Sequence, residues 1–200
     1  MALRDRLETQ VARKKYQPDV WSSLIRDALN DRHSSDQIRD ERVRDVFNRL
    51  LEVYPLASAQ WVRYATYEFE RSHYDKVEEI FSRALSNVRA VDLYKFYMDY
   101  IYKMNTTETG LPTSPQAHNT ILQASEFVLN RVGIDKDSGA LWSQYLAYLK
   151  KQQPQSQWEE QQKIEGLRAA YHRAIVVPMD HLEQIWKEYD AFENGINRFT

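Results

Sequence analysis

Large apolar residues recur along this chain at the spacing of a helix face. In the stretch QWVRYATYEFE, residues 60–70, the rings of Trp61, Tyr64 and Tyr67 lie three positions apart. Residues three and four apart share one side of an α-helix, so the stretch predicts a helix with an aromatic face. These rings could either bind a ligand or hold helices together.

The same pattern of apolar positions occurs five times. Each copy has an aromatic residue, a bulky residue three positions later, and another apolar residue after six or seven positions. The leading aromatic residues are 40, 33, 48 and 44 positions apart, and they are Trp21, Trp61, Tyr94, Trp142 and Trp186. Periods of this length are typical of stacked helix pairs.

A second pattern lies between these copies. It has an aromatic residue, then any residue, then arginine, and it begins at Phe47, Phe81 and Tyr171. A weaker version around Phe127 has its arginine displaced to Arg131. The chain therefore predicts an alternation of helix A, which carries the first pattern, with helix B, which carries the second.

The predicted domain boundaries follow from this alternation. A basic helical lead-in is expected at 1–17, and a repeat domain at 18–200 with repeats near 18–55, 58–90, 91–133, 138–178 and an incomplete 181–200. The polar stretches NTTETGLPTSPQ and KKQQPQSQWEEQQ are interpreted as insertions between helices A and B. Ser58 and Asp92 are expected to cap helices A, and Gly133 to end a helix B.

The aromatic stripes are expected to form the seams between helices, because one short helix pair cannot bury its apolar face alone. Glu68 or Glu70, and Glu193, are expected to bond neighbouring helices or the recurring arginines. The expected packing residues are Trp21, Leu24, Phe47, Trp61, Tyr64, Phe81, Tyr94, Tyr97, Phe127, Trp142, Tyr145, Tyr171, Trp186 and Tyr189.

Composition supports an all-helical protein. The chain has 200 residues, of which 42% are apolar, with only five glycines. It contains no cysteine, which excludes disulfides and cysteine-ligated metal. No apolar run approaches the ~18 residues of a membrane helix, and the first residues lack a signal-peptide core. The net charge of −2 argues against a face that clamps duplex nucleic acid.

No motif predicts a catalytic residue, a cofactor site or a metal site. The five histidines form no HExxH pattern and no cluster with carboxylates. No glycine-rich phosphate loop and no GxSxG elbow is present. Paired acids such as Glu78–Glu79 are interpreted as solvated helix faces.

Basic residues near the N-terminus allow two interpretations. They could form a contact patch for RNA phosphates or for an acidic protein. They could also pair on helix faces with nearby acids, and this second interpretation is favoured; the acids are Asp36, Asp40, Glu41 and Asp45. The spacing of four also predicts the pairs Asp40–Arg44 and Glu79–Arg83 on exposed faces. The residues of the possible patch are Arg13, Lys14, Lys15, Arg39, Arg42 and Arg44.

Helix A resembles the first helix of the tetratricopeptide repeat (TPR), but its small glycine position is filled by Ile25, Ala65, Met98, Leu146 and Asp190. Together with the aromatic-x-Arg of helix B, it resembles the half-a-TPR, or HAT, repeat. The resemblance implies an all-α, right-handed superhelical array of antiparallel helix pairs, with about four and a half repeats.

Linked blocks narrow the resemblance. PDVWSSLIRDA, YDKVEEIFSRAL, DLYKFYMDYI and QIWKEYDAFENGIN, over about residues 12–198, resemble the suppressor-of-forked family, the HAT subunit of cleavage stimulation factor. The resemblance implies a nuclear, non-enzymatic scaffold of pre-mRNA 3′-end cleavage and polyadenylation. It implies contacts with other subunits of that complex, weak or indirect RNA contact and no membrane. The family homodimerises through a C-terminal HAT half, which this chain is expected to lack.

Three other functions stay open at this point. They are a HAT scaffold of the spliceosome or of ribosomal RNA processing, a TPR-like peptide-binding cochaperone, and an enzyme. A cochaperone would need a groove with carboxylate-binding Lys and Asn residues, and an enzyme would need a cleft with convergent acids. The last helix A, with Trp186 and Phe192, is further expected to fray or to self-associate weakly.

Overall fold

The computed structural model describes residues 3–31 and 33–196, and every regular element in these ranges is an α-helix. The all-α prediction is therefore confirmed. The chain divides into two compact units, Met1–Val88 and Arg89–Thr200. The last four residues of the expected fifth repeat and the first two of the lead-in lie outside the described residues.

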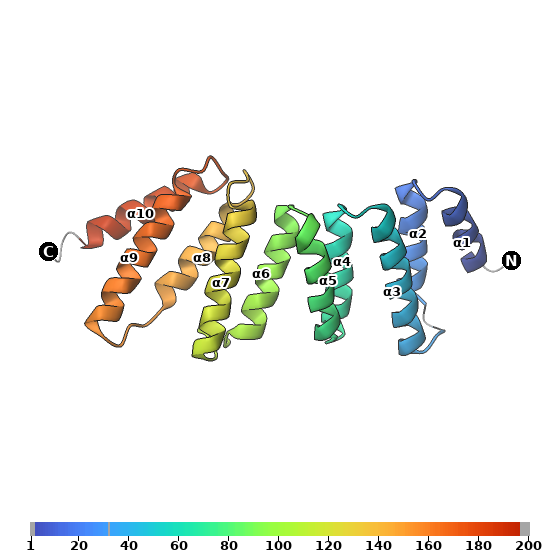
Figure 1. Ribbon diagram of the computed structural model, residues 1–200, viewed down its shortest axis with the longest axis horizontal. Helices are drawn as coiled ribbons and strands as arrows, with labels where there is room; N and C mark the ends of the chain where they lie inside the picture. The colour runs from blue at the N-terminus through green and yellow to red at the C-terminus, as the bar shows by residue number, and fades with distance from the viewer. Residues whose placement is uncertain (1–2, 32, 197–200) are drawn as a thin grey trace. The chain divides into compact units, whose positions relative to one another are not determined.

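The first unit is a series of antiparallel helices, each in contact with the next along the chain (Figure 1). The helix α1 occupies the expected lead-in, α2 and α4 carry the helix A pattern, and α3 and α5 carry the helix B pattern. Their bounds are Leu3–Arg13 for α1, Pro18–Leu29 for α2, Asp36–Val53 for α3, Ser58–Glu70 for α4 and Tyr74–Asn87 for α5.

The second unit repeats this arrangement. The helices α6, α8 and α10 carry the helix A pattern, and α7 and α9 carry the helix B pattern, with consecutive helices again packed together. Their bounds are Val91–Asn105 for α6, Pro115–Val132 for α7, Gly139–Lys151 for α8, Gln157–Ala174 for α9 and Leu182–Ile196 for α10.

Aromatic rings form much of the core of each unit. In the first unit Phe47 of α3 stacks on Tyr64 of α4, with ring centroids 4.9 Å apart. In the second, Tyr94 of α6 contacts Phe127 of α7 with centroids 6.0 Å apart. Burial of one such ring contributes about 2–3 kcal/mol. The helices are therefore held by interhelical contacts more than by their own propensity.

Helix starts follow local chemistry, although two predicted caps are wrong. The hydroxyls of Ser35, Ser114 and Ser156 accept from backbone N–H groups in the first turns of α3, α7 and α9. Ser58 and Asp92, however, lie inside the first turns of α4 and α6, after Ala57 and Ala90. Gly133 follows the last residue of α7, as predicted.

The two polar stretches are more ordered than loops of that composition suggest. The first closes as a short turn, in which Thr106 and Pro112 pair and Gly110 takes the left-handed φ of 77°. The second is only partly a loop, because α8 continues to Lys151 and α9 already begins at Gln157. Its interpretation as an insertion is therefore corrected for residues 150–151 and 157–162.

Candidate functional site

The tryptophans of helix A join each helix to the loop before it. The indole N–H of Trp21 donates to the carbonyl of Lys15 at 2.7 Å, and that of Trp61 donates to the carbonyl of Pro55 at 2.8 Å. In the second unit Trp142 donates to the carbonyl of Gly133 at 2.8 Å. All three side chains are buried. These rings have a structural role and are not open to a ligand.

The arginine of helix B lies over the tryptophan of its own repeat. The guanidinium carbon of Arg83 is 5.2 Å from the ring centroid of Trp61, and that of Arg173 is 5.3 Å from the centroid of Trp142. Arg49 lies over Trp21 at 6.0 Å. These distances suit a cation–π contact, which explains why the two patterns recur together.

The same arginines reach back to the preceding helix B or, in the first repeat, to α1. Arg49 donates to both carboxylate oxygens of Glu8, at 3.0 and 3.1 Å. Arg83 donates to the side-chain oxygen of Asn48 at 2.9 Å, and Arg173 donates to Glu126 at 2.8 Å. Each arginine thus links its repeat to the preceding element. In the third repeat the displaced Arg131 lies over Phe127 of its own helix instead.

The glutamates of helix A pair with arginines of the preceding helix B, as predicted. Arg44 of α3 donates through Nε and Nη2 to the two oxygens of Glu68, at 2.7 and 2.8 Å. Arg168 of α9 meets Glu193 of α10 through the same atoms, at 2.6 and 2.9 Å. The hydrogen bond from Arg168 holds the pKa of Glu193 below its ordinary value.

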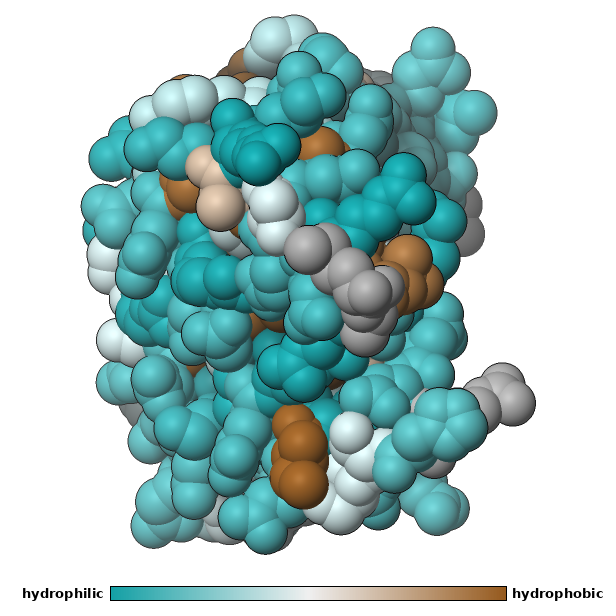
Figure 2. All heavy atoms as spheres, turned by 90° about the vertical axis from the view of Figure 1, so that its right-hand side faces the viewer, coloured by the Kyte–Doolittle hydropathy of each residue, from teal (hydrophilic) through white to brown (hydrophobic). Residues whose placement is uncertain are grey.

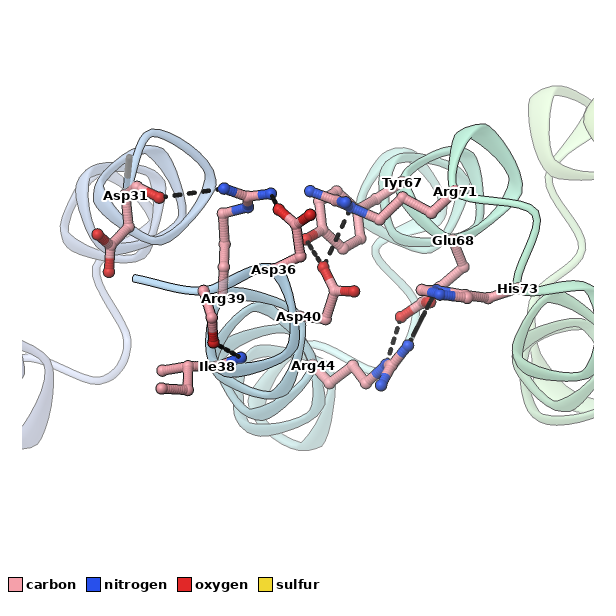
Figure 3. Close-up of polar contacts among 11 residues, drawn as sticks. Asp31, Asp36, Ile38, Arg39, Asp40, Arg44, Tyr67, Glu68, Arg71 and His73 are labelled. Atoms are coloured by element: carbon pink, nitrogen blue, oxygen red, sulfur yellow. Dashed lines mark hydrogen bonds and ion pairs between the residues drawn. The ribbon is translucent and has the colours of Figure 1, made fainter. Parts of the chain in front are cut away.

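The Glu68 carboxylate is fully buried, and Figure 3 shows how its surroundings satisfy it. His73 lies against the same oxygen that Arg44 Nη2 contacts, with Nδ1 2.8 Å from Oε2. The hydrogen bond with Glu68 raises the pKa of Arg44. A buried acid with a bidentate arginine and a histidine could suggest chemistry, but Arg44 and Glu68 hold α3 to α4, and His73, just before α5, contacts both.

A second buried carboxylate, Asp40, lies beside this pair (Figure 3). It accepts from the Tyr67 hydroxyl at 2.5 Å, and Arg71 Nε lies 3.1 Å from the same oxygen. Burial and the hydrogen bond to Asp40 raise the pKa of Tyr67 to about 12. The predicted pair Asp40–Arg44 is wrong, because Asp40 turns inward to α4. Glu79 likewise bonds Lys76, not Arg83.

The side chains of the possible basic patch lie in two settings. Arg13, the last residue of α1, is exposed, as are Lys14 and Lys15, which follow it. Arg39 pairs with Asp36, and Arg42 pairs with both Asp27 and Asp31, while Arg44 holds Glu68. The arginines of α3 are thus engaged by carboxylates of the chain itself. As Figure 2 shows, the α1 end of the molecule is mostly hydrophilic, with isolated hydrophobic residues.

The expected packing residues differ in burial. Tyr97, Phe127 and Tyr189 are partly exposed. Trp186 is 54% exposed, so its assignment as a packing residue is corrected. Its neighbour Ile185 faces the core, and one step along a helix turns the next side chain by about 100°. The fully packed set is Trp21, Leu24, Phe47, Trp61, Tyr64, Phe81, Tyr94, Trp142, Tyr145 and Tyr171.

Across residues 3–31 and 33–196, no three His, Asp or Glu side chains lie close enough together to hold a metal ion. No described helix is long and apolar enough to cross a membrane.

These features define a helical-repeat protein in which Trp–Arg contacts lie within repeats and Glu–Arg pairs join consecutive repeats. The family model for suppressor of forked protein matches residues 3–200. The chain therefore belongs to the suppressor of forked family.

Curated relatives agree with this assignment. The chain is 40% identical over 184 residues to mRNA 3′-end-processing protein rna14 of Emericella nidulans. The aligned region covers 90% of this chain and 16% of the relative. It is 38% identical over 162 residues to rna14 of Schizosaccharomyces pombe, covering 81% of this chain and 21% of the relative. For RNA14 of Yarrowia lipolytica the identity is 32% over 197 residues, 97% of this chain and 23% of the relative. The chain thus spans less than a quarter of the length of these relatives.

Proposed function

We propose that this chain is part of a non-enzymatic scaffold of pre-mRNA 3′-end cleavage and polyadenylation, and that it acts through protein–protein contacts. The observation that carries the proposal is the match of almost the whole chain to relatives that are named mRNA 3′-end-processing proteins. Its partners are other subunits of that complex, and its place of action is the nucleus. Homodimerisation is the role of the C-terminal HAT half of the family's proteins.

The geometry supports a scaffold in place of an enzyme. The charged groups that could suggest catalysis, Glu68, Asp40 and Arg44, are engaged in contacts between α3 and α4. The recurring aromatic rings are likewise buried in packing in four of the five helices A, at Trp21, Trp61, Tyr94 and Trp142. Function then resides on the surface that the packed helices present, as is usual for repeat arrays.

RNA contact is proposed to be weak or indirect. The net charge is −2, and the arginines of α3 are paired with carboxylates. Tight non-specific RNA binding needs several unpaired cations that neutralise phosphates. The exposed Arg13, Lys14 and Lys15 are the part of the proposed basic patch that remains open to an acidic partner or to RNA.

The test is capture of tagged chain from a nuclear extract of its own organism, followed by mass spectrometry. Recovery of cleavage and polyadenylation subunits above an untagged control is expected. Recovery of spliceosomal, ribosome-assembly or chaperone proteins in their place would contradict the proposal.

A further inference from the structure

Loops that lead into a helix A carry large apolar side chains that face solvent. In the first unit these are Tyr16 before α2 and Leu56 before α4, which are 71% and 68% exposed. In the second unit they are Ile134 before α8 and Val176 before α10, which are 84% and 76% exposed. Single exposed apolar residues are common on protein surfaces, but these four recur in the same kind of loop. Their recurrence indicates a surface that is used for binding.

The indole of the following helix A holds three of these loops in place. In each case the carbonyl that accepts the indole hydrogen bond belongs to the residue directly before the exposed side chain. The accepting carbonyls are those of Lys15, Pro55 and Gly133. Each indole is buried, so it fixes the loop backbone against the core. The side chains of Tyr16, Leu56 and Ile134 are thus presented on ordered loops, which lowers the entropy cost of binding a partner.

In the second unit the two loops are also bonded to each other. The backbone N–H of Asp180 donates to the carbonyl of Lys136 at 2.8 Å, and the N–H of Gly139 donates to the Asp180 carboxylate at 2.8 Å. Figure 1 shows the α7–α8 and α9–α10 loops side by side at the upper edge of this unit. Ile134 and Val176 therefore belong to one ordered surface.

The same two loops carry an excess of acidic side chains. Asp135, Asp137 and Asp180 are exposed, against one exposed lysine, Lys136. Lys136 is paired with Asp137, with Nζ 2.8 Å from the carboxylate. Within the described residues, Asp135 and Asp180 pair with no lysine or arginine. The surface therefore favours a positively charged partner and disfavours RNA phosphates or an acidic protein.

We propose that the loops 133–138 and 175–181 form a docking surface for a basic segment of a partner protein. Aliphatic side chains of that segment pack on Ile134 and Val176, and its lysine or arginine residues meet the unpaired aspartates. The inference rests on the scaffold function proposed above and deepens it by naming the chemistry of one contact.

The experiment is selection of phage-displayed random dodecapeptides on the immobilised 200-residue chain. Phage that also bind the double variant Ile134→Ser, Val176→Ser are removed before each round, so that enrichment reports this surface. Both replaced side chains are exposed, so the double variant should keep the thermal midpoint of the parent, as measured by circular dichroism. Sequences that combine lysine or arginine with aliphatic residues are expected.

Two single variants test the charge and the place of binding on synthesised peptides, whose Kd values are measured by fluorescence polarisation. Asp135→Asn keeps the acceptor for the backbone N–H of Asp137 but removes the charge. It should weaken binding by ~threefold or more and reduce the rise of Kd with added salt. Leu56→Ser is the matched control. Leu56 is also exposed on an indole-held loop, but that loop, residues 54–57, contains no acid, so Kd should not change.

Four results would overturn the inference. They are no enrichment, enrichment of acidic or uncharged sequences, an equal loss of affinity in Asp135→Asn and Leu56→Ser, and a dimer of the parent chain that the double variant breaks. The last, measured by sedimentation equilibrium, would assign the surface to a second copy of this chain. Selection uses no polyadenylation factors, so each failure leaves the result of the extract capture, and with it the scaffold proposal, untouched.

Discussion

At the scale of single residues, the fold depends on a few side chains that repeat their role from one helix pair to the next. The helix A tryptophan bonds the loop before it, and the helix B arginine covers that tryptophan and reaches the preceding element. Burial of Trp21, Trp61 and Trp142 could be predicted from their spacing. The carbonyl that each indole meets could not, because the loop conformation is not encoded in the helical period.

Replacing Trp61 by phenylalanine tests the first of these roles. Trp61→Phe keeps an aromatic ring but removes the donor to the Pro55 carbonyl. A loss of about 1–2 kcal/mol in the free energy of unfolding is expected, measured by urea denaturation. Trp186→Phe is the control. Trp186 is exposed, so its substitution should change the midpoint little; an equal loss in both variants would contradict the assigned role.

The two Glu–Arg pairs offer a comparison at matched geometry. Glu68→Gln leaves Arg44 without its anionic partner in a buried setting, and a loss of about 2–3 kcal/mol is expected from the same denaturation measurement. Glu193→Gln breaks the same bidentate contact at a more exposed site. Its effect should be smaller than that of Glu68→Gln, because solvent screens the exposed pair. The burial argument fails if the two variants lose equal stability.

The buried Asp40 marks a limit of sequence interpretation. Its distance of four from Arg44 favoured a surface pair, yet it bonds Tyr67 and Arg71 of the next helix. Local spacing describes neighbours on one helix. It does not show which face of that helix the next helix covers, so a partner 27 residues away is invisible to it.

At the scale of elements, the alternation of A and B helices could be read from the chain because two periodic patterns agreed. The start of α9 could not, since Gln157 to Gly166 carry no buried face and resemble a polar loop in composition. Trp186 was misplaced for a related reason. Its pattern matches the other helices A, but burial depends on how many neighbours cover the helix.

The first residue of α8, Gly139, lies against the backbone of Asp180, so that only a glycine fits there. A Cβ on Gly139 would lie 2.0 Å from the carbonyl oxygen of Asp180. Gly139→Ala should therefore cost about 1–3 kcal/mol, although alanine is the better helix former. Gly166→Ala, where a Cβ meets nothing, should gain up to about 1 kcal/mol. Thermal unfolding of both variants checks the sign; a gain for Gly139→Ala would refute the close approach.

The packing of α10 should weaken in acid. Hydrogen bonds from Lys150 and Arg168 hold the pKa values of Glu188 and Glu193 below their ordinary values. A lowered pKa in the folded state contributes stability that is present above the unfolded pKa of about 4.3 and is lost as pH falls through the folded value. The thermal midpoint should thus fall between about pH 5 and pH 3.

Glutamine variants separate the contribution of these two carboxylates to the acid sensitivity from that of the other carboxylates in the chain. The double variant Glu188→Gln, Glu193→Gln should show a smaller decline of the thermal midpoint over that pH range than the parent. An unchanged decline would mean that other carboxylates carry the acid sensitivity. Circular dichroism at each pH is sufficient for the measurement.

At the scale of the whole molecule, the two compact units together span only part of the length of the relatives. Aromatic and ionic side chains are engaged inside each unit, and the surface of the second unit contains a groove lined by α7, α8 and α9. The family could be predicted from the sequence because its blocks lie in order along the chain. The groove could not, since it arises where three helices meet.

We propose that this chain acts in 3′-end processing through protein contacts. The most direct measurement adds purified chain as a competitor to a nuclear extract that both cleaves a polyadenylation substrate and splices a second pre-mRNA. Concentration-dependent inhibition of 3′-end cleavage with splicing unchanged is expected, with no inhibition by heat-denatured chain. Inhibition of splicing with cleavage unchanged would contradict it, as would undisturbed cleavage at a large excess of the chain.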